Sequence, residues 1–191
     1  FADPEKMLLA ELRWQHVLRT HYNRFCDLPT GLPDTWQLGI QFQNVGEAWF
    51  FGAEVNFPDG QVPDTLPFLT EDNKRAVFDV DITRPLDRNP YKLGYEFTER
   101  MHELARHMEF KGRPVEVVRY APAGPEGAVT TAISLRGGAD FLTDLVLDED
   151  YAQELLAFLV KAEAVRVQAA AERSGEPLTQ VSYADDALQM L

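Results

Sequence analysis

Apolar residues recur at helical spacing in the middle of the chain. From Tyr91 onward they follow one another at intervals of four, four, three and four residues, at Leu93, Phe97, Met101, Leu104 and Met108. This stripe is typical of an amphipathic helix, and Gly112 is expected to end it because glycine terminates helices readily. The segment is therefore predicted to pack one face against a core.

The first and the longest predicted helices have clear signals at their ends. Asp3 is expected to cap the first helix, with Pro4 at its first helical position. The apolar face of this helix comprises Leu8, Leu12, Trp14, Val17 and Leu18 and continues to about Phe25. The longest helix is predicted to begin at the acidic run 148–150 and to end at Gly175. The residues of this helix that are expected to face inward are Leu155, Leu156, Leu159, Val160 and Val167.

Local patterns predict five shorter elements. They are a helix at 34–49, a strand at 52–57, a short helix from 71 to about 80, and helices at 126–135 and 139–145. The helix at 34–49 rests on the spacing of Trp36, Ile40, Val45 and Trp49. Because no internal repeat and no domain boundary is evident, the 191 residues are interpreted as a single domain.

Two further strands are predicted on either side of the last helices. The first covers Val115–Tyr120, the second covers 177–183, and helices connect them. A helical crossover of this kind makes the two strands parallel. The second strand leads into Asp185 and Asp186, at the carboxyl end where parallel α/β folds carry their chemistry. The chain is therefore predicted to be an α/β protein with parallel strands and long helices.

Composition and charge exclude several classes of function. Hydrophobic residues make up 45% and charged residues 26%, which is typical of a globular protein. The net charge of −13, with scattered basic residues, argues against nucleic acids and anionic membranes as partners. No apolar stretch reaches about 18 residues and no secretion signal is evident, so a cytoplasmic location is expected. Cys26 is the single cysteine, which excludes an internal disulfide and a multi-cysteine metal cluster within these residues.

The order of motifs resembles the uroporphyrinogen decarboxylase superfamily. Phe51–Val55 is followed by a proline-spaced loop, and the Gly124-Pro125 turn opens a helix that ends at Leu135–Gly138. A further apolar helix, an acidic helix start and the strand leading to Asp185-Asp186 complete the pattern, which covers about residues 34–190. The superfamily includes porphyrinogen decarboxylases and methyltransferases that exchange methyl groups with corrinoid proteins or coenzyme M. The resemblance implies a TIM-type (β/α) barrel, of which this chain would form the N-terminal portion, because a complete barrel usually takes about 250 residues.

Departures from the family pattern bear on the reaction. Decarboxylases of the family bind substrate carboxylates with an arginine-rich loop near the start, and this sequence has none. They place an aspartate before the strand at 52–57, where Gln43 stands here, and a tyrosine where Ala132 stands. An amide cannot supply the charge with which a carboxylate stabilises four pyrrole nitrogens. Methyl transfer is therefore preferred, and the alternatives are decarboxylation of a tetrapyrrole or another carboxylate, and a non-catalytic binding half-barrel.

The resemblance also implies a metal and partners. The methyltransferases hold zinc through histidine and cysteine late in the barrel, so that a substrate thiol binds as a thiolate. Those ligands would lie beyond Leu191, and no metal site is predicted within the chain, so the cofactor stays unknown. A small-molecule substrate and a corrinoid protein are the expected partners. A half-barrel leaves open sheet edges, so a homodimer is also expected.

Asp185 and Asp186 are the catalytic candidates. A carboxylate at a strand end can accept a proton or orient a metal-binding histidine. Neighbouring strand residues point to opposite faces, so at most one of the two is expected to face a barrel mouth. The alternative is that the pair caps the next helix, and the two interpretations have about even weight.

The candidates for substrate binding are Gln43, Arg119, Tyr120 and Gly124. Arg119 is suited to hold an anion, although an ion pair with a surface acid is the more common role of such an arginine. Gly124 begins a turn that leaves backbone N–H groups at a helix start, and turn geometry alone also explains it. His102 and His107 are five residues apart, so they lie on different helix faces and cannot chelate one ion together.

Overall fold

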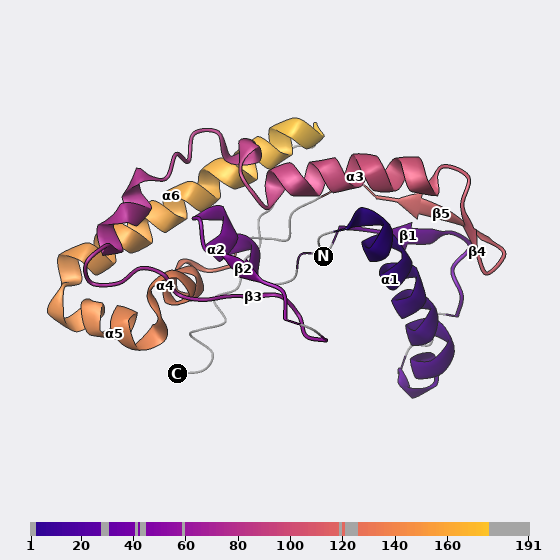
Figure 1. The fold of residues 1–191 in the computed structure, drawn as a ribbon, viewed down its shortest axis with the longest axis horizontal. Coiled ribbons are helices and arrows are strands. Elements are labelled where there is room, and N and C mark those ends of the chain that lie inside the picture. The colour runs from indigo at the N-terminus through magenta and orange to yellow at the C-terminus, as the bar shows by residue number, and fades with distance from the viewer. Residues whose placement is uncertain are drawn as a thin grey trace. The chain divides into compact units, whose positions relative to one another are not determined.

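The computed structural model describes residues 3–27, 31–40, 42, 45–58, 60–118, 120 and 126–175 (Figure 1). It is a mixed α/β chain, mostly helical with few strands. It divides into two compact units. Unit 1 comprises Phe1–Gln41 and Leu93–Tyr120, and unit 2 comprises Phe42–Lys92 and Ala121–Leu191.

Unit 1 begins with α1 (Pro4–Val17), as predicted. Asp3 caps the helix: its side chain accepts hydrogen bonds from the backbone N–H groups of Glu5 and Lys6, at 2.9 and 3.1 Å. A π-helical turn (Leu18–Tyr22) and a 3-10 turn (Asn23–Phe25) continue it. The apolar face is narrower than predicted, because Leu8 and Leu12 are buried whereas Trp14 is 54% exposed. At about 100° per residue, Trp14 lies on the side of the helix opposite Leu12.

The sheet of unit 1 corrects the prediction of a helix at 34–49. Its three strands are β1 (Trp36–Leu38), β4 (Glu109–Phe110) and β5 (Arg113–Val117), in the order β1-β5-β4. β1 is parallel to β5, with Trp36 beside Val115 and Leu38 beside Val117, and β4 is antiparallel to β5. Trp36 and Leu38 are buried and Gln37 is exposed, so the segment alternates as a strand does. The strand predicted at Val115–Tyr120 is confirmed in its first half.

The predicted amphipathic helix is confirmed as α3 (Tyr91–Ala105), with Phe97 and Met101 buried. It ends at Ala105, and Gly112 does not terminate it. Gly112 instead forms the two-residue turn between β4 and β5 together with Lys111, and both have positive φ, 71° and 52°. Such turns are favoured in hairpins because their backbone twist matches that of the strands.

Unit 2 is built mainly from helices. They are α2 (Gly46–Phe50), α4 (Ala128–Arg136), α5 (Gly138–Leu147) and α6 (Glu149–Ser174), with a short antiparallel pair of β2 (Val55–Asn56) and β3 (Asp64–Thr65) and 3-10 turns at Lys74–Asp79 and Pro85–Asp87. The three predicted helices after residue 125 and the short helix near residue 80 are therefore confirmed, and the strand predicted at 52–57 is shorter. α6 packs against α4 and α5.

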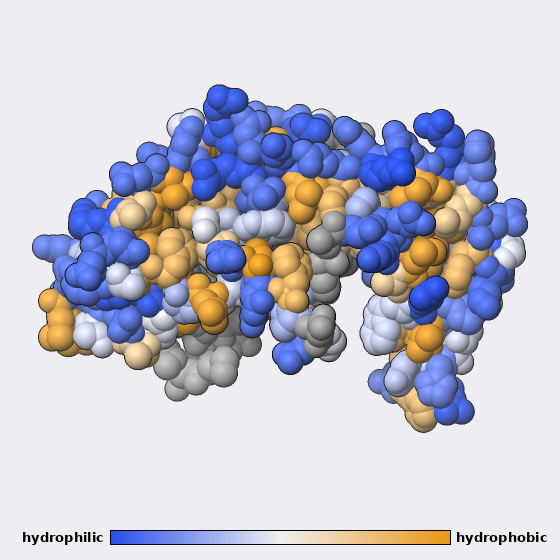
Figure 2. Space-filling view, viewed as in Figure 1, coloured by the Kyte–Doolittle hydropathy of each residue, from blue (hydrophilic) through white to orange (hydrophobic). Residues whose placement is uncertain are grey.

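The residues predicted to face inward on α6 are only partly confirmed. Leu155 and Leu159, four residues apart, are fully buried, whereas Val160 is 54% exposed. A residue five positions from Leu155 is rotated by about 140° from it, which turns Val160 toward solvent. Hydrophobic residues also reach the surface over α5, where Val146 and Leu147 are 78% and 79% exposed (Figure 2).

The predicted TIM-type barrel is not shown: the described residues contain one parallel strand pair, β1 with β5, and the pairs β2 with β3 and β4 with β5 are antiparallel. The strand predicted at 177–183 lies outside the described residues. β5 already has β1 on one side, and β4 on the other beside Pro114 and Arg113. A second parallel partner of β5 would therefore pair with its carboxyl-terminal residues, beyond β4. Among the described residues, no helix is long and apolar enough to cross a membrane.

Candidate functional site

The carboxyl ends of β1 and β5 lie next to each other because the two strands are parallel. Their pairing continues past the last strand residue, where the Val118 N–H donates to the Leu38 carbonyl at 2.8 Å. Gly39 lies against Val118, and a Cβ at Gly39 would be 3.7 Å from the Val118 side chain. This shared edge is the part of unit 1 in which a parallel α/β fold places its binding residues.

Tyr120 is the one predicted site residue that the structure describes. Tyr120 is 9% exposed and its ring lies against α3, with the ring of Tyr95 edge-on at a centroid distance of 5.5 Å. A Cβ at Gly94 would be only 2.4 Å from the Tyr120 ring, so the absence of a side chain at this position makes room for Tyr120. In this structure the ring packs in the core of unit 1.

The other predicted site residues lie outside the described residues. They are Gln43, Arg119, Gly124, Asp185 and Asp186. In the sequence, Gln43 comes five residues after the end of β1 and Arg119 two residues after the end of β5. Two of the predicted binding residues therefore follow β1 and β5 closely in the sequence.

Unit 2 contains a buried ion network that sequence analysis did not predict. Arg136, with 5% of its side chain exposed, lies 2.8 Å from the equally buried Asp144 and 2.8 Å from Glu71, and it donates to the Leu69 carbonyl at 3.0 Å. Lys74 lies 2.7 Å from Asp148 and 3.5 Å from Asp144. The hydrogen bond with Asp144 raises the pKa of the Arg136 guanidinium, and the bond from Lys74 lowers the pKa of Asp148.

A second buried ion pair joins α2 to α6. Arg166, 1% exposed, lies 2.5 Å from Glu47, and its guanidinium is 4.7 Å from the centre of the Phe50 ring. In both clusters the positive groups have carboxylate partners, so neither presents an isolated acid or base for proton transfer. We therefore interpret them as structural.

The described residues contain no group of three or more histidine, cysteine, aspartate or glutamate side chains able to hold a metal ion. His102 and His107 are exposed. Comparison with known proteins found no matching family model, no matching curated protein and no matching solved structure. A functional assignment therefore depends on the residues and the geometry described above.

Proposed function

We propose that this chain is the N-terminal portion of a barrel enzyme of the uroporphyrinogen decarboxylase superfamily that transfers a methyl group between a corrinoid and a thiol. The observation that carries the proposal is the parallel pairing of β1 with β5 in the register Trp36 to Val115. Parallel neighbouring strands are what an α/β barrel is built from, and the chain leaves both strands at the same end of the pair. The motif order that resembles the superfamily supports the same interpretation.

The residues after these strands have roles that follow from their chemistry. Arg119 would hold an anionic group of the substrate through its planar guanidinium. Asp185, and with less weight Asp186, would orient a metal-binding histidine or accept a proton. A porphyrinogen needs a carboxylate beneath its pyrroles. Gln43 is a neutral amide, so it suits a different substrate. A cytoplasmic location and a corrinoid protein partner belong to this proposal.

The experiment is a methyl-transfer assay with the purified full-length protein. Methylcobalamin and a small thiol serve as substrates. The thiolate forms a C–S bond with the methyl group, and the electron pair of the broken Co–C bond stays on cobalt, which is visible by absorbance. We expect thioether formation that needs zinc and that falls by about a hundredfold in Asp185→Asn, the size of a lost acid–base role.

The matched control is Asp150→Asn, at an exposed position near the start of α6, which should retain full activity. Decarboxylation of uroporphyrinogen by the same protein, without methyl transfer, would replace this proposal with the decarboxylase alternative. The absence of both activities in a folded, zinc-loaded protein would favour the non-catalytic alternative.

A further inference from the structure

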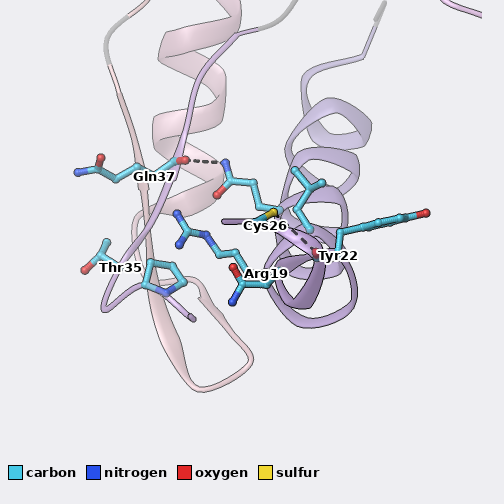
Figure 3. Close-up of a pocket in the computed structure, with 9 residues that line it drawn as sticks. Arg19, Tyr22, Cys26, Thr35 and Gln37 are labelled. Atoms are coloured by element: carbon cyan, nitrogen blue, oxygen red, sulfur yellow. Dashed lines mark hydrogen bonds between the residues drawn. The ribbon is translucent and has the colours of Figure 1, made fainter. Parts of the chain in front are cut away.

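A cleft of about 560 Å³ opens on unit 1 beside the π-helical turn that follows α1 (Figure 3). One wall is formed by the end of α1, the π-helical turn and the residues after it, and the other by Pro33, Thr35 and Gln37. Small-molecule sites commonly have volumes of about 300–1,000 Å³. π-helical turns are rare and frequently occur at functional positions.

Arg19 supplies the charge of this cleft. Among the described residues that line the cleft, it is the one side chain that is ionised at neutral pH. It extends from the helical wall toward the wall that carries Thr35 (Figure 3), and its Nη1 donates to the Gly31 carbonyl at 3.0 Å. This bond orients the guanidinium at the cleft, in a chain whose net charge is −13.

The remaining lining is neutral and mixed. The Gln15 side chain bridges the two walls, since its Nε2 donates to the Gln37 carbonyl at 2.8 Å. Asn23 and Thr35 add amide and hydroxyl groups, and Leu18 and Pro33 add apolar surface. A guanidinium beside neutral donors and a small apolar surface is the chemistry that recognises an organic anion.

We propose that this cleft binds a small organic anion whose carboxylate or phosphate group pairs with Arg19. The site is separate from the proposed barrel site. Pro33 and Thr35 precede β1, so the cleft lies beside the amino-terminal side of this strand. The proposed catalytic residues follow the carboxyl end of the strands. The inference therefore adds a second ligand site and does not depend on the proposed reaction.

Cys26 allows binding of a ligand in the cleft to be measured. It lines the cleft, its side chain is exposed, and it is the single cysteine of the chain. The rate at which neutral iodoacetamide alkylates Cys26 is measured in the whole protein at constant ionic strength, with benzoate and inorganic phosphate titrated separately. We expect one or both anions to slow alkylation in a saturable way, because a ligand on Arg19 covers the thiol.

Arg19→Gln should weaken this protection by roughly tenfold to a hundredfold, as expected for a lost charge-assisted hydrogen bond. Arg13→Gln is the matched control: Arg13 is an exposed arginine of α1 outside the cleft, and the variant should behave as the wild type. Protection by benzoate, by phosphate or by both identifies the recognised group.

Two results would overturn the proposal. One is the absence of protection by either anion, and the other is equal protection in wild type and Arg19→Gln. If Arg19→Gln does not fold, as judged by circular dichroism, Arg19→Lys takes its place. Lysine keeps the charge but lacks the planar fork, so protection must weaken measurably. Unchanged protection in a folded Arg19→Lys would overturn pairing through the planar guanidinium fork, because an ammonium group cannot reproduce its two parallel hydrogen bonds.

Discussion

The two units have cores of different chemistry. Among the described residues of unit 1, Thr98 is the one buried polar side chain, and the core consists of residues such as Trp36, Leu38 and Met101. In the described part of unit 2 the buried polar and charged residues are Lys74, Thr131, Arg136, Asp144, Glu163 and Arg166. Unit 1 therefore depends mainly on apolar burial, whereas unit 2 also depends on charges that must remain paired.

This difference has a thermodynamic consequence. An apolar core loses stability in proportion to the volume removed from it. A buried ion pair contributes little to the free energy of unfolding compared with well-packed apolar residues. The loss of one partner nevertheless leaves an uncompensated charge in a protein interior that solvates it poorly. Mutations that keep side-chain volume but remove a buried charge should therefore destabilise unit 2, whereas the core of unit 1 should be sensitive mainly to lost volume.

The largest effect is expected from Trp36→Ala in unit 1. Trp36 is fully buried, its indole N–H donates to the Phe110 carbonyl at 2.8 Å, and its ring meets those of Phe110 and His16. The free energy of unfolding in urea should fall by about 3–5 kcal/mol. Trp14→Ala is the control, since Trp14 is 54% exposed and its loss should change stability by less than about 0.5 kcal/mol. Similar losses in both variants would contradict the core assigned to unit 1.

Asp144→Asn tests the ionic core of unit 2 at nearly constant volume. It removes the buried carboxylate that lies 2.8 Å from Arg136. We expect a loss of about 3 kcal/mol in the free energy of unfolding, because Arg136 keeps its charge with weaker compensation. Asp140→Asn removes another partner of the same arginine, 3.3 Å away but 64% exposed, and should cost less than about 1 kcal/mol. If the order of these two losses were reversed, the network would not depend on burial.

The elements that could be predicted are those with local signals. The cap of α1, the stripe of α3 and the Gly175 that ends α6 each depend on residues within a few positions of one another. The segment at β1 was misinterpreted because Trp36 and Ile40 are four residues apart, as in a helix. Trp36, Leu38, Ile40 and Phe42 are all buried, so an alternation with period two was present in the sequence and is the signal that would have identified this strand.

Contacts over long sequence distances could not be predicted. The parallel partner of β5 is β1, and the register that joins Trp36 to Val115 has no local signal. Arg136 meets Glu71 across 65 residues, and a single charged residue in a sequence usually indicates a solvated surface. For the candidate site, the strand ends were the signal that selected the candidate residues, and Tyr120 shows that a residue at such an end can pack in the core.

Gly94→Ala tests this role of Tyr120. The added methyl group would lie 2.4 Å from the ring, so the ring or α3 must move, and we expect a loss of about 2 kcal/mol despite the better helix propensity of alanine. In the Tyr120→Ala background the same substitution has room, and it should be neutral or stabilising. A double-mutant cycle by urea unfolding measures the coupling. Additive effects would mean that Tyr120 does not occupy this space, which would return it to the candidate substrate-binding residues.

The smallest expected effect is a pH-dependent change in stability that comes from Asp148, a partly exposed member of the ion network. The hydrogen bond from Lys74 lowers the pKa of Asp148 below its ordinary value of 3.8. The folded state therefore binds this proton less readily than the unfolded state, so the contribution of Asp148 is complete well above pH 3.8 and is lost as the pH falls through the lowered value. The difference in unfolding free energy between wild type and Asp148→Asn should be constant near neutral pH and shrink on acidification. Asp150→Asn, two positions away and exposed, should show no such change. A difference that grew on acidification would require Asp148 to be protonated more readily in the folded protein, which is incompatible with its bond to Lys74.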